Sequence, residues 1–360
     1  MFNSFNCFGA CGRQIQVSDT SGVVQHFYVR DVLDKGGFSS IELVSSRSTR
    51  ELFVLKRIPC HSKSDELKAL NEARLHCSLP PHPNILPCIG FDVKSLRTHT
   101  QGAISEVLMV LQYCKRGTLQ HELERRKQVG SGGLPIYVAV TIMIGLCDAL
   151  LILLSLDVPL CHRDIKPGNV LLSDNWCPML IDFGSTTPAR IEISSYRESE
   201  RWKVRLLVVQ TIIWVSGFCG GKLFYDLPSA GVFPTSSTSM YYGKSRYLGS
   251  ARNLHYINCL FQSLGCLLYA MFFLISPMDL VVARGDSVAL AACSANIPFP
   301  KDASPASPDM IELICTMLSV NPDSRPSLHE VCARLRLLEP KLVCFNEWTE
   351  GTTEAVVLRA

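Results

Sequence analysis

The stretch CHRDIKPGNVLLSDNWCPMLIDFG, residues 161–184, sets a few polar side chains between short apolar runs. Two carboxylates, Asp164 and Asp182, occur there with the amide of Asn169 and the amine of Lys166. Phosphoryl transfer needs a group that positions the incoming hydroxyl, oxygen ligands for Mg²⁺ and a positive charge near the transferred oxygens. Mg²⁺ prefers oxygen donors, which Asp182 and Asn169 would supply. The stretch therefore predicts a phosphoryl-transfer site with Asp164, Lys166 and Asn169 as its catalytic residues.

A second interpretation treats the same stretch as two unrelated polar turns between strands. Against it stand two motifs in order, His-Arg-Asp at 162–164 followed by Asn169, and Asp-Phe-Gly at 182–184. One short motif arises readily by chance, but two at compatible spacing arise much less often. We therefore favour the phosphoryl-transfer interpretation.

The composition is that of a folded protein with a large core. The 360 residues are 47% hydrophobic and 19% charged, which excludes a chain that is disordered throughout. This length suits one two-lobed domain or two small domains. The formal net charge of +3 is too small to indicate binding to nucleic acid or to a membrane surface, so no nucleic-acid partner is expected.

The 16 cysteines are scattered singly, without a CxxC pair, and we recognise no secretory signal. This pattern predicts reduced thiols in an intracellular protein. A zinc site is not expected without paired ligands.

Two apolar segments bear on membrane insertion, because a membrane span needs about 20 apolar residues. The apolar residues 142–156 are followed by Asp157. Together with the apolar residues that precede them from 136, they are interpreted as a buried helix. Residues 206–219 are short and contain Gln210, and a membrane-embedded segment there stays an alternative.

The first residues leave lipid attachment open. Residue 2 is Phe, whereas N-myristoylation needs Gly at that position. Cys7 and Cys11 could carry palmitate and give peripheral membrane association, although one lipid rarely anchors a protein stably. A frayed terminus is the alternative interpretation.

Strand-like segments precede the opening stretch. Lys56 interrupts the apolar segment 52–58, and a buried ammonium group is costly unless it has partners. Glu72, on the helix predicted next, is the best candidate partner, and a solvated helix face is the alternative for Glu72 alone. Residues 33–41 include two consecutive glycines, where the missing Cβ lets another group approach the backbone.

Together these motifs resemble those of eukaryotic serine/threonine protein kinases. The chain is more narrowly similar to the myristoylated and palmitoylated kinases of the Numb-associated kinase group. The resemblance covers about residues 27–200 and 262–338. The stretches that carry it are 55–58, 82–86, 115–119, 263–271 and, most specifically, 285–290.

The resemblance implies an α+β, bilobal protein-kinase fold with a small β-rich N-lobe and a larger helical C-lobe. We predict an N-terminal segment at 1–26, a kinase domain at 27–338 and a C-terminal tail at 339–360. Within the kinase domain, the N-lobe would span 27–111 and the C-lobe 115–338.

The resemblance also implies the reaction, in which the γ-phosphate of ATP passes, with Mg²⁺, to hydroxyl groups of protein substrates. Lys166, two residues after Asp164, is the serine/threonine-type feature. Asp164 would orient the hydroxyl and accept its proton, Lys166 would steady the γ-phosphate, and Asn169 and Asp182 would hold Mg²⁺. Such kinases are intracellular, so a cytoplasmic location with Golgi or vesicle association is expected.

The nucleotide-binding residues follow from the same resemblance. Residues 33–41 would form a Gly-rich loop, although Asp34 and Ser39 occupy two of its glycine positions. Backbone groups of a hinge after the gatekeeper Leu111 would bind the adenine. The full predicted set is Leu33, Gly36, Gly37, Ile41, Lys56, Glu72, Gln112, Cys114 and Asp182.

Residues 203–261 depart from the kinase pattern. Leu260 and Gln262 hold the places of an aspartate and a tryptophan, and Lys222 would replace the glutamate of Ala-Pro-Glu. That glutamate would pair with a buried arginine matching Arg325, and breaking such a pair costs about 3–5 kcal/mol. The segment would be a true insert or an error in the sequence. An ATP-binding pseudokinase is therefore the alternative to an active enzyme.

Overall fold

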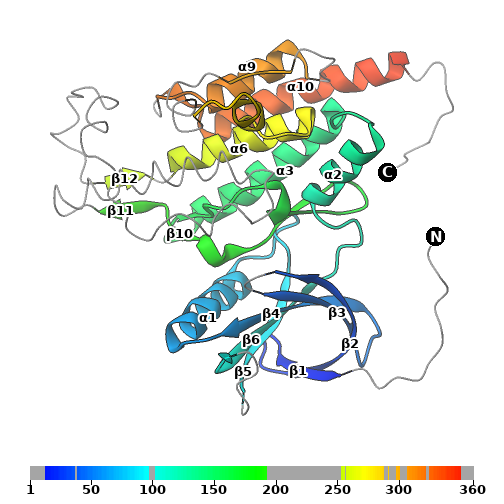
Figure 1. Cartoon of the computed structure of the whole chain (residues 1–360), viewed down its shortest axis with the longest axis vertical. Coiled ribbons are helices and arrows are strands. Elements are labelled where there is room, and N and C mark those ends of the chain that lie inside the picture. The colour runs from blue at the N-terminus through cyan, green and yellow to red at the C-terminus, as the bar shows by residue number, and fades with distance from the viewer. Residues whose placement is uncertain are drawn as a thin grey trace. The chain divides into compact units, whose positions relative to one another are not determined.

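Figure 1 shows the chain as a computed structural model, which describes residues 13–36, 39–96, 102–192, 253–255, 257–287, 291, 297–300, 306–321 and 324–349. The chain divides into two units. Unit 1 comprises Met1–Lys115 with Asp182–Gly184, and unit 2 comprises Arg116–Ile181 with Ser185–Ala360. The short segment Asp182–Gly184 therefore belongs with residues from much earlier in the chain.

Unit 1 is built on one antiparallel sheet with the strand order β1-β2-β3-β4-β6-β5. Each neighbouring pair is antiparallel. The strands are β1 (Gln14–Ser18), β2 (Val24–Lys35), β3 (Ser40–Ser46), β4 (Leu52–Cys60), β5 (Cys88–Ser95) and β6 (Ser105–Gln112).

The sheet curls until its two edge strands meet, as Figure 1 shows for β1 and β5. An antiparallel bridge joins Asp19, just after β1, to Gly90 in β5. The Thr20 amide also donates to the Ile89 carbonyl at 3.3 Å. This contact protects strand edges that would otherwise be open to pairing. The interior of the curled sheet is an apolar cluster of Ile15, Val17, Phe27, Val44, Leu55, Leu108 and Val110.

Strand β1 extends the folded domain ahead of the predicted boundary at residue 27. Ile15 and Val17 are buried whereas Gln14 and Gln16 are exposed, which is the alternation of a strand with one buried face. The sheet therefore begins at Gln14, ahead of the predicted boundary at residue 27. Two alternating apolar residues are too few to identify a strand until the sheet that receives them is known.

A polar turn sets the hairpin of β1 and β2. The Asp19 carboxylate accepts bonds from the amide and hydroxyl of Ser21, the Val23 amide and the Gln25 side chain at 2.6–3.0 Å. The bonds from Ser21 and Gln25 favour the charged form and lower the pKa of Asp19 to about 2. Gly22 completes the turn at a φ of 85°, a conformation that glycine adopts without steric cost.

Helix α1 (Lys63–Ser78) packs against β4, β5 and β6 mainly through small residues. The Ser62 hydroxyl caps its start by accepting the Asp65 amide at 3.1 Å. Its buried positions are Ala69, Ala73 and His76. Two alanines remove little apolar area from water, and Leu70 and Leu75 are only half-buried, so hydrophobic burial contributes modestly to holding this helix.

Cys77, near the end of α1, and Cys88, the first residue of β5, form a disulfide with Cα atoms 5.1 Å apart. The prediction that the cysteines are all reduced is therefore wrong at this pair. A separation of 11 residues matches no motif. Only the return of the chain from α1 into β5 brings the two cysteines together.

Unit 2 is mainly helical (Figure 1). Its helices are α2 (Leu119–Val129), α3 (Ile136–Ser155), α6 (Ile257–Phe273), α7 (Asp279–Ala283), α9 (Pro308–Met317) and α10 (Leu328–Thr349). Its short strands pair as β7 (Leu160–Cys161) with β10 (Thr187–Pro188), β8 (Val170–Leu172) with β9 (Pro178–Leu180), and β11 (Arg190–Glu192) with β12 (Asn253–His255).

Helix α3 forms the core of unit 2. Helices α6 and α10 and strands β7 and β9 pack against it, and its residues are buried on several sides from Val138 to Leu153. It is long and apolar enough to cross a membrane by length and composition, but 61% of that window is buried inside the protein. The predicted buried helix within residues 136–156 is confirmed.

The structure describes both the predicted C-terminal boundary and the end of the atypical segment. Helix α10 continues through the predicted domain end at residue 338. Residues 253–255 form β12, and residues 257–261 open α6, so this end of the segment 203–261 has regular structure. The remainder of that segment, the apolar stretch 206–219, Lys222, Cys7 and Cys11 lie outside the described residues.

The closure of the sheet by β1 can be tested at Gly90. A Cβ at this position would collide with the Ser18 carbonyl and the Asp19 Cα. Gly90→Ala should destabilise the protein by about 1–3 kcal/mol, the usual cost of overpacking, measured by urea denaturation. Gly168→Ala is the control, because a Cβ there meets no atom within 4 Å. Equal stability of the two variants would contradict the close approach of β1 to β5.

Candidate functional site

Lys56 lies in the middle of β4 and faces away from the interior core of the sheet. Its partners across the strands are Ile41 in β3 and Met109 in β6, so these three share one face. The neighbouring Leu55 points to the other face and belongs to the apolar cluster. Strand alternation alone therefore keeps the ammonium out of the core.

Two carboxylates share the Lys56 ammonium. Its Nζ atom lies 2.7 Å from Glu72 Oε1 and 3.4 Å from Asp182 Oδ1. The Lys56 and Glu72 side chains are 15% and 11% exposed, and the Asp182 side chain is 41% exposed. The partner expected from the sequence, Glu72, is thus in contact, and Asp182 joins the pair from the segment that follows β9.

Burial and charge act in opposite directions on this group. Desolvation alone would lower the pKa of Lys56, but the charges of Asp182 and Glu72 outweigh it and the pKa is raised. Burial raises the pKa of Glu72, with Lys56 opposing the shift and Asp182 adding to it. The Lys56 ammonium thus lies between two carboxylates, and an Asp182 carboxylate is a group that a divalent cation would bind.

The segment Asp182–Gly184 is held in a strained and closely packed conformation. Asp182 has a φ of 66°, a left-handed conformation that costs a non-glycine residue on the order of 1 kcal/mol. Phe183 is buried, with its ring centroid 4.7 Å from that of His76. A Cβ on Gly184 would lie 2.9 Å from Glu72 Oε2, so glycine permits the close approach of this segment to the ion pair.

A second polar cluster, in unit 2, surrounds Asp164. Lys166 Nζ donates to Asp164 Oδ2 at 2.8 Å. Asn169 Nδ2 donates to the same Oδ2 atom and to the Asp164 backbone oxygen, each at 2.8 Å. Both bonds use the amide nitrogen of Asn169, so its amide oxygen is the atom suited to a cation. Asp164 Oδ1 takes part in none of these bonds and is suited to accept a proton from a hydroxyl group.

His162 anchors the loop that carries this cluster. Its ring is fully buried and accepts the Asp164 amide at Nδ1, at 3.3 Å, so Nε2 carries the proton and donates to the Ile181 carbonyl at 3.0 Å. The Ile181 amide in turn donates to the Asn169 carbonyl at 3.1 Å. Arg163, between the two loop residues, has a φ of 69°. The loop that carries Asp164 is thereby tied by hydrogen bonds to the end of the β8–β9 hairpin.

The other predicted nucleotide-binding residues lie along unit 1. Leu33 is exposed near the end of β2, and the Gly36 amide closes the turn between β2 and β3 with a hydrogen bond of 2.9 Å. Gln112 ends β6, where its amide donates to a backbone carbonyl at 3.3 Å. Cys114 follows in an irregular segment, and Gly37 lies outside the described residues.

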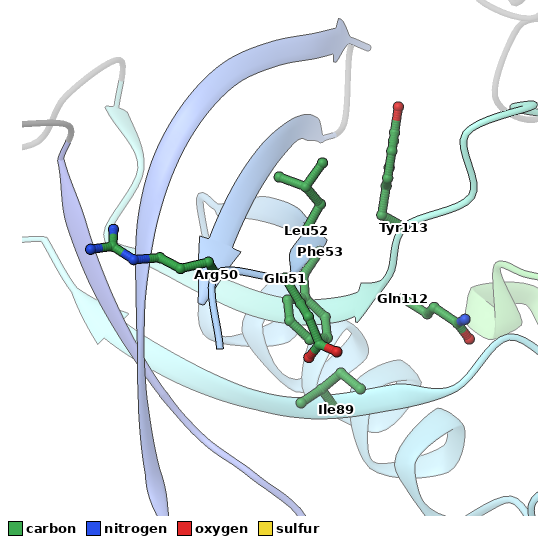
Figure 2. A pocket seen from close by; sticks show the side chains of 7 residues that line it. All are labelled: Arg50, Glu51, Leu52, Phe53, Ile89, Gln112 and Tyr113. Carbon is green, nitrogen blue, oxygen red and sulfur yellow. The ribbon is translucent and has the colours of Figure 1, made fainter. Parts of the chain in front are cut away.

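A hollow of about 500 Å³ opens on unit 1, on the opposite face of the sheet from Lys56. Phe53 and Gln112 lie across from each other in β4 and β6, and alternation puts both on the face of the core. Figure 2 shows Glu51, Phe53 and Ile89 together and Arg50 turned away from them. The hollow is therefore not part of the ion-pair site. Its lining residues are Arg50, Glu51, Leu52, Phe53, Ile89, Gln112 and Tyr113.

Sequence reasoning missed His76. This side chain is buried, its Nε2 atom donates to the Leu86 carbonyl at 2.7 Å, and its ring packs against Phe183. It lies one helical turn after Glu72, and the i, i+4 relation places both residues on the same face of α1. That spacing is the signal that could have identified it.

Two of the atypical positions of unit 2 belong to α6. Leu260 and Gln262 are buried in α6, and Gln262 Oε1 has no hydrogen-bond partner among the described residues. Arg325 donates from Nε to the Ser319 carbonyl at 2.8 Å and from its guanidinium to the Val320 carbonyl at 3.3 Å. Backbone carbonyls after α9 thus accept hydrogen bonds from the buried arginine.

Comparison with known proteins points to the same part of the chain. The model of the protein kinase domain family matches residues 27–202. The serine/threonine-protein kinases 16 of Rattus norvegicus and Homo sapiens are each 32% identical to the chain over 308 residues, which cover 86% of this chain and 88% of theirs. The chain belongs to the serine/threonine protein kinases.

More distant similarity agrees with this assignment. A probable serine/threonine-protein kinase of Dictyostelium discoideum is 26% identical over 320 residues, which cover 88% of this kinase and 25% of that longer protein. The match to the kinase domain includes all the predicted site residues, from Leu33 to Asp182. Similarity to serine/threonine kinases along most of the chain favours an enzyme over the pseudokinase alternative.

The shared ammonium can be tested by replacing Lys56 with Met. At neutral pH this should cost about 3 kcal/mol, since removing one partner strands the buried charge of the other. Because burial raises the pKa of Glu72, the folded variant binds a proton more readily than the unfolded chain, and the loss should shrink as the pH falls from 7 toward 4.5. Denaturant unfolding at pH 7 and at pH 4.5 measures the loss of stability in the variant relative to the wild type.

Lys63→Met is the matched control. The Lys63 side chain is 80% exposed and pairs with Glu66 on the surface. Such pairs contribute about 0–1 kcal/mol. Similar losses for the two variants, or a loss for Lys56→Met that does not change with pH, would contradict the buried ion pair.

Proposed function

We propose that the chain transfers the γ-phosphate of ATP to serine and threonine hydroxyls of protein substrates, with each predicted site residue in the role that kinase chemistry gives it. The observation that carries the proposal is the cluster in which Lys166 and Asn169 both bond Asp164 Oδ2. This arrangement fixes the carboxylate and leaves its other oxygen toward a hydroxyl substrate. Kinase catalysis consists mainly of positioning and electrostatic stabilisation, which such a fixed cluster supplies.

Asp164 orients the substrate hydroxyl and accepts its proton through Oδ1. Lys166 stabilises the negative charge that gathers on the transferred phosphoryl group. Its ammonium donates to Asp164 Oδ2 at 2.8 Å, which keeps Lys166 next to the carboxylate that orients the substrate hydroxyl. A charge that is already in place needs no reorganisation when the phosphoryl group moves.

The donor set fits magnesium. Asn169 keeps its amide oxygen for a cation because its nitrogen is bonded to Asp164, and Asp182 offers a carboxylate that contacts the Lys56 ammonium. Both are the hard oxygen donors that Mg²⁺ takes alongside water and substrate phosphates. When bound, Mg²⁺ would neutralise charge on the phosphate oxygens.

Unit 1 would provide the remaining nucleotide contacts. Lys56, held by Glu72 at 2.7 Å, binds the α- and β-phosphates, and the backbone of Gln112 and Cys114 binds the adenine. Leu33, Gly36, Gly37 and Ile41 form the loop over the phosphates. In this proposal unit 1 corresponds to the N-lobe of a bilobal kinase and unit 2 to the C-lobe.

The cellular setting is also proposed. Residues 285–290 resemble the Numb-associated kinases, which supports membership of that group and a cytoplasmic location with Golgi or vesicle association. Peripheral attachment through palmitate on Cys7 or Cys11 is part of the same proposal. The small net charge of +3 agrees with protein substrates and gives no reason to expect nucleic acid.

Asp164→Asn tests the catalytic role. An amide cannot accept the hydroxyl proton, so kcat for phosphate transfer to a serine- and threonine-containing basic protein should fall by about 10²–10⁴-fold. Asp174→Asn is the control, because Asp174 is an exposed turn residue of the same unit. Radiolabelled γ-phosphate followed by phosphoamino-acid analysis gives the readout. Equal labelling by the wild type and Asp164→Asn would refute the assignment.

Asp182→Asn tests the metal ligand. Loss of a carboxylate ligand should raise the Mg²⁺ concentration that gives half-maximal activity by at least about tenfold, the lower end of effects seen for outer-shell groups. Asp31→Asn serves as control, because this carboxylate is exposed on β2. A magnesium titration at saturating ATP measures the shift. An unchanged magnesium requirement would place the metal elsewhere.

A further inference from the structure

The disulfide between Cys77 and Cys88 sits at the end of the helix that positions Glu72. Cys77 is the next-to-last residue of α1, and Cys88 opens β5. Their Cα separation of 5.1 Å lies within the ordinary range for a disulfide. The bond therefore ties the C-terminal turn of α1 to the sheet.

A hydrogen bond joins the same two segments beside this bond. His76, the residue before Cys77, donates from Nε2 to the carbonyl of Leu86, two residues before Cys88, at 2.7 Å. The His76 ring also packs against Phe183, next to Asp182. The end of α1 that the disulfide holds is thus the end in contact with the Asp-Phe-Gly segment.

Little else fixes α1 in place. Its buried residues are Ala69, Ala73 and His76, whereas Leu67 is exposed and Leu70 and Leu75 are only half-buried. The remaining ties are polar, from Lys56 to Glu72 and from Ser105 to Glu66. Because none of the leucines of α1 is fully buried, a covalent link adds substantially to what holds the helix in place.

We propose that the Cys77–Cys88 bond is a redox-controlled tether that holds Glu72 on Lys56. In the oxidised form α1 is fastened to β5 and the ion pair is formed, as the structure has it. In the reduced form only weak packing and polar contacts hold the helix, so Glu72 leaves Lys56 more often. The proposal rests on the proposed function, because kinases need this ion pair for phosphate binding.

The chemistry is thiol–disulfide exchange with a low-molecular-weight disulfide such as glutathione disulfide. The thiolate of one cysteine attacks a sulfur of glutathione disulfide and releases one glutathione thiolate. The second protein thiolate then attacks the mixed disulfide and releases the other. Two protein thiols are oxidised, one glutathione disulfide is reduced to two thiols, and the protons leave with the thiols. Neither Cys77 nor Cys88 is fully buried, so a small disulfide can reach them.

The test compares the full chain after equilibration with glutathione disulfide and after reduction by dithiothreitol. Peptide mapping without reduction should find the Cys77–Cys88 cross-link only in the oxidised sample. Amide hydrogen exchange over residues 63–78 should be slower in the oxidised form, and the Kd for Mg-ATP should be at least about fivefold lower, the small end of ordinary coupling between a ligand and a conformational change.

Variants separate this pair from the other thiols. Cys88→Ser and Cys77→Ser should each show reduced-form exchange and affinity under both conditions, so one variant suffices if the other fails to fold. Cys315→Ser, which removes an exposed cysteine of unit 2, should behave as the wild type. Absence of the cross-link, or equal α1 exchange and Mg-ATP affinity in both forms, overturns the tether.

The two proposals can fail separately. Slower α1 exchange on oxidation without any phosphate transfer would support the tether and refute the proposed function. If Asp164→Asn abolishes phosphate transfer and Cys88→Ser leaves Mg-ATP affinity and α1 exchange unchanged, the proposed function is supported and the tether is refuted.

Discussion

The ammonium of Lys56, placed in a β-strand and shared by two carboxylates, is the interaction on which unit 1 depends. A desolvated charge is unfavourable unless partners compensate it, so the partners must be held where the strand presents the lysine. Glu72 comes from α1, and Asp182 comes from a segment 126 residues later in the chain. The raised pKa of Lys56 shows that the two carboxylates more than offset its burial. The position of α1 and the conformation of Asp182–Gly184 are therefore both coupled to one cation.

The loop around Asp164 is held mainly by hydrogen bonds, whereas the site around Lys56 is held by contacts of two carboxylates with one ammonium. His162 and Asn169 hold the loop to the backbone at Ile181, the residue just before Asp182. In both loops a non-glycine residue takes a left-handed backbone conformation, Arg163 in one and Asp182 in the other. Such strain persists only where surrounding contacts determine the conformation, and it is typical of functional segments. The buried helix α3 gives the Asp164 loop a rigid support.

Some elements were predictable because their signals are local. A lysine inside an apolar strand requires an acidic partner, and an uninterrupted apolar run of helical length requires burial, so Lys56 and α3 could be identified from their neighbours alone. Strand β1 was missed because it has only Ile15 and Val17 to mark it, and its role as the strand that closes the sheet depends on the Gly90 contact far along the chain. The sequence indicated that the glutamate expected to pair with Arg325 is replaced by Lys222, but the bonds from Arg325 to the carbonyls of Ser319 and Val320 were visible only in the structure.

By itself the sequence determined the chemistry of this protein, because the carboxylates, the amide and the lysines occur in short motifs whose spacing carries the information. It also determined the alternation that turns Lys56 away from the core. The tertiary structure decided which groups meet across long separations: Asp182 with Lys56, His76 with Phe183, and Cys77 with Cys88. These contacts arise where the curled sheet and α1 bring distant segments together, and no local pattern of residues records such a meeting.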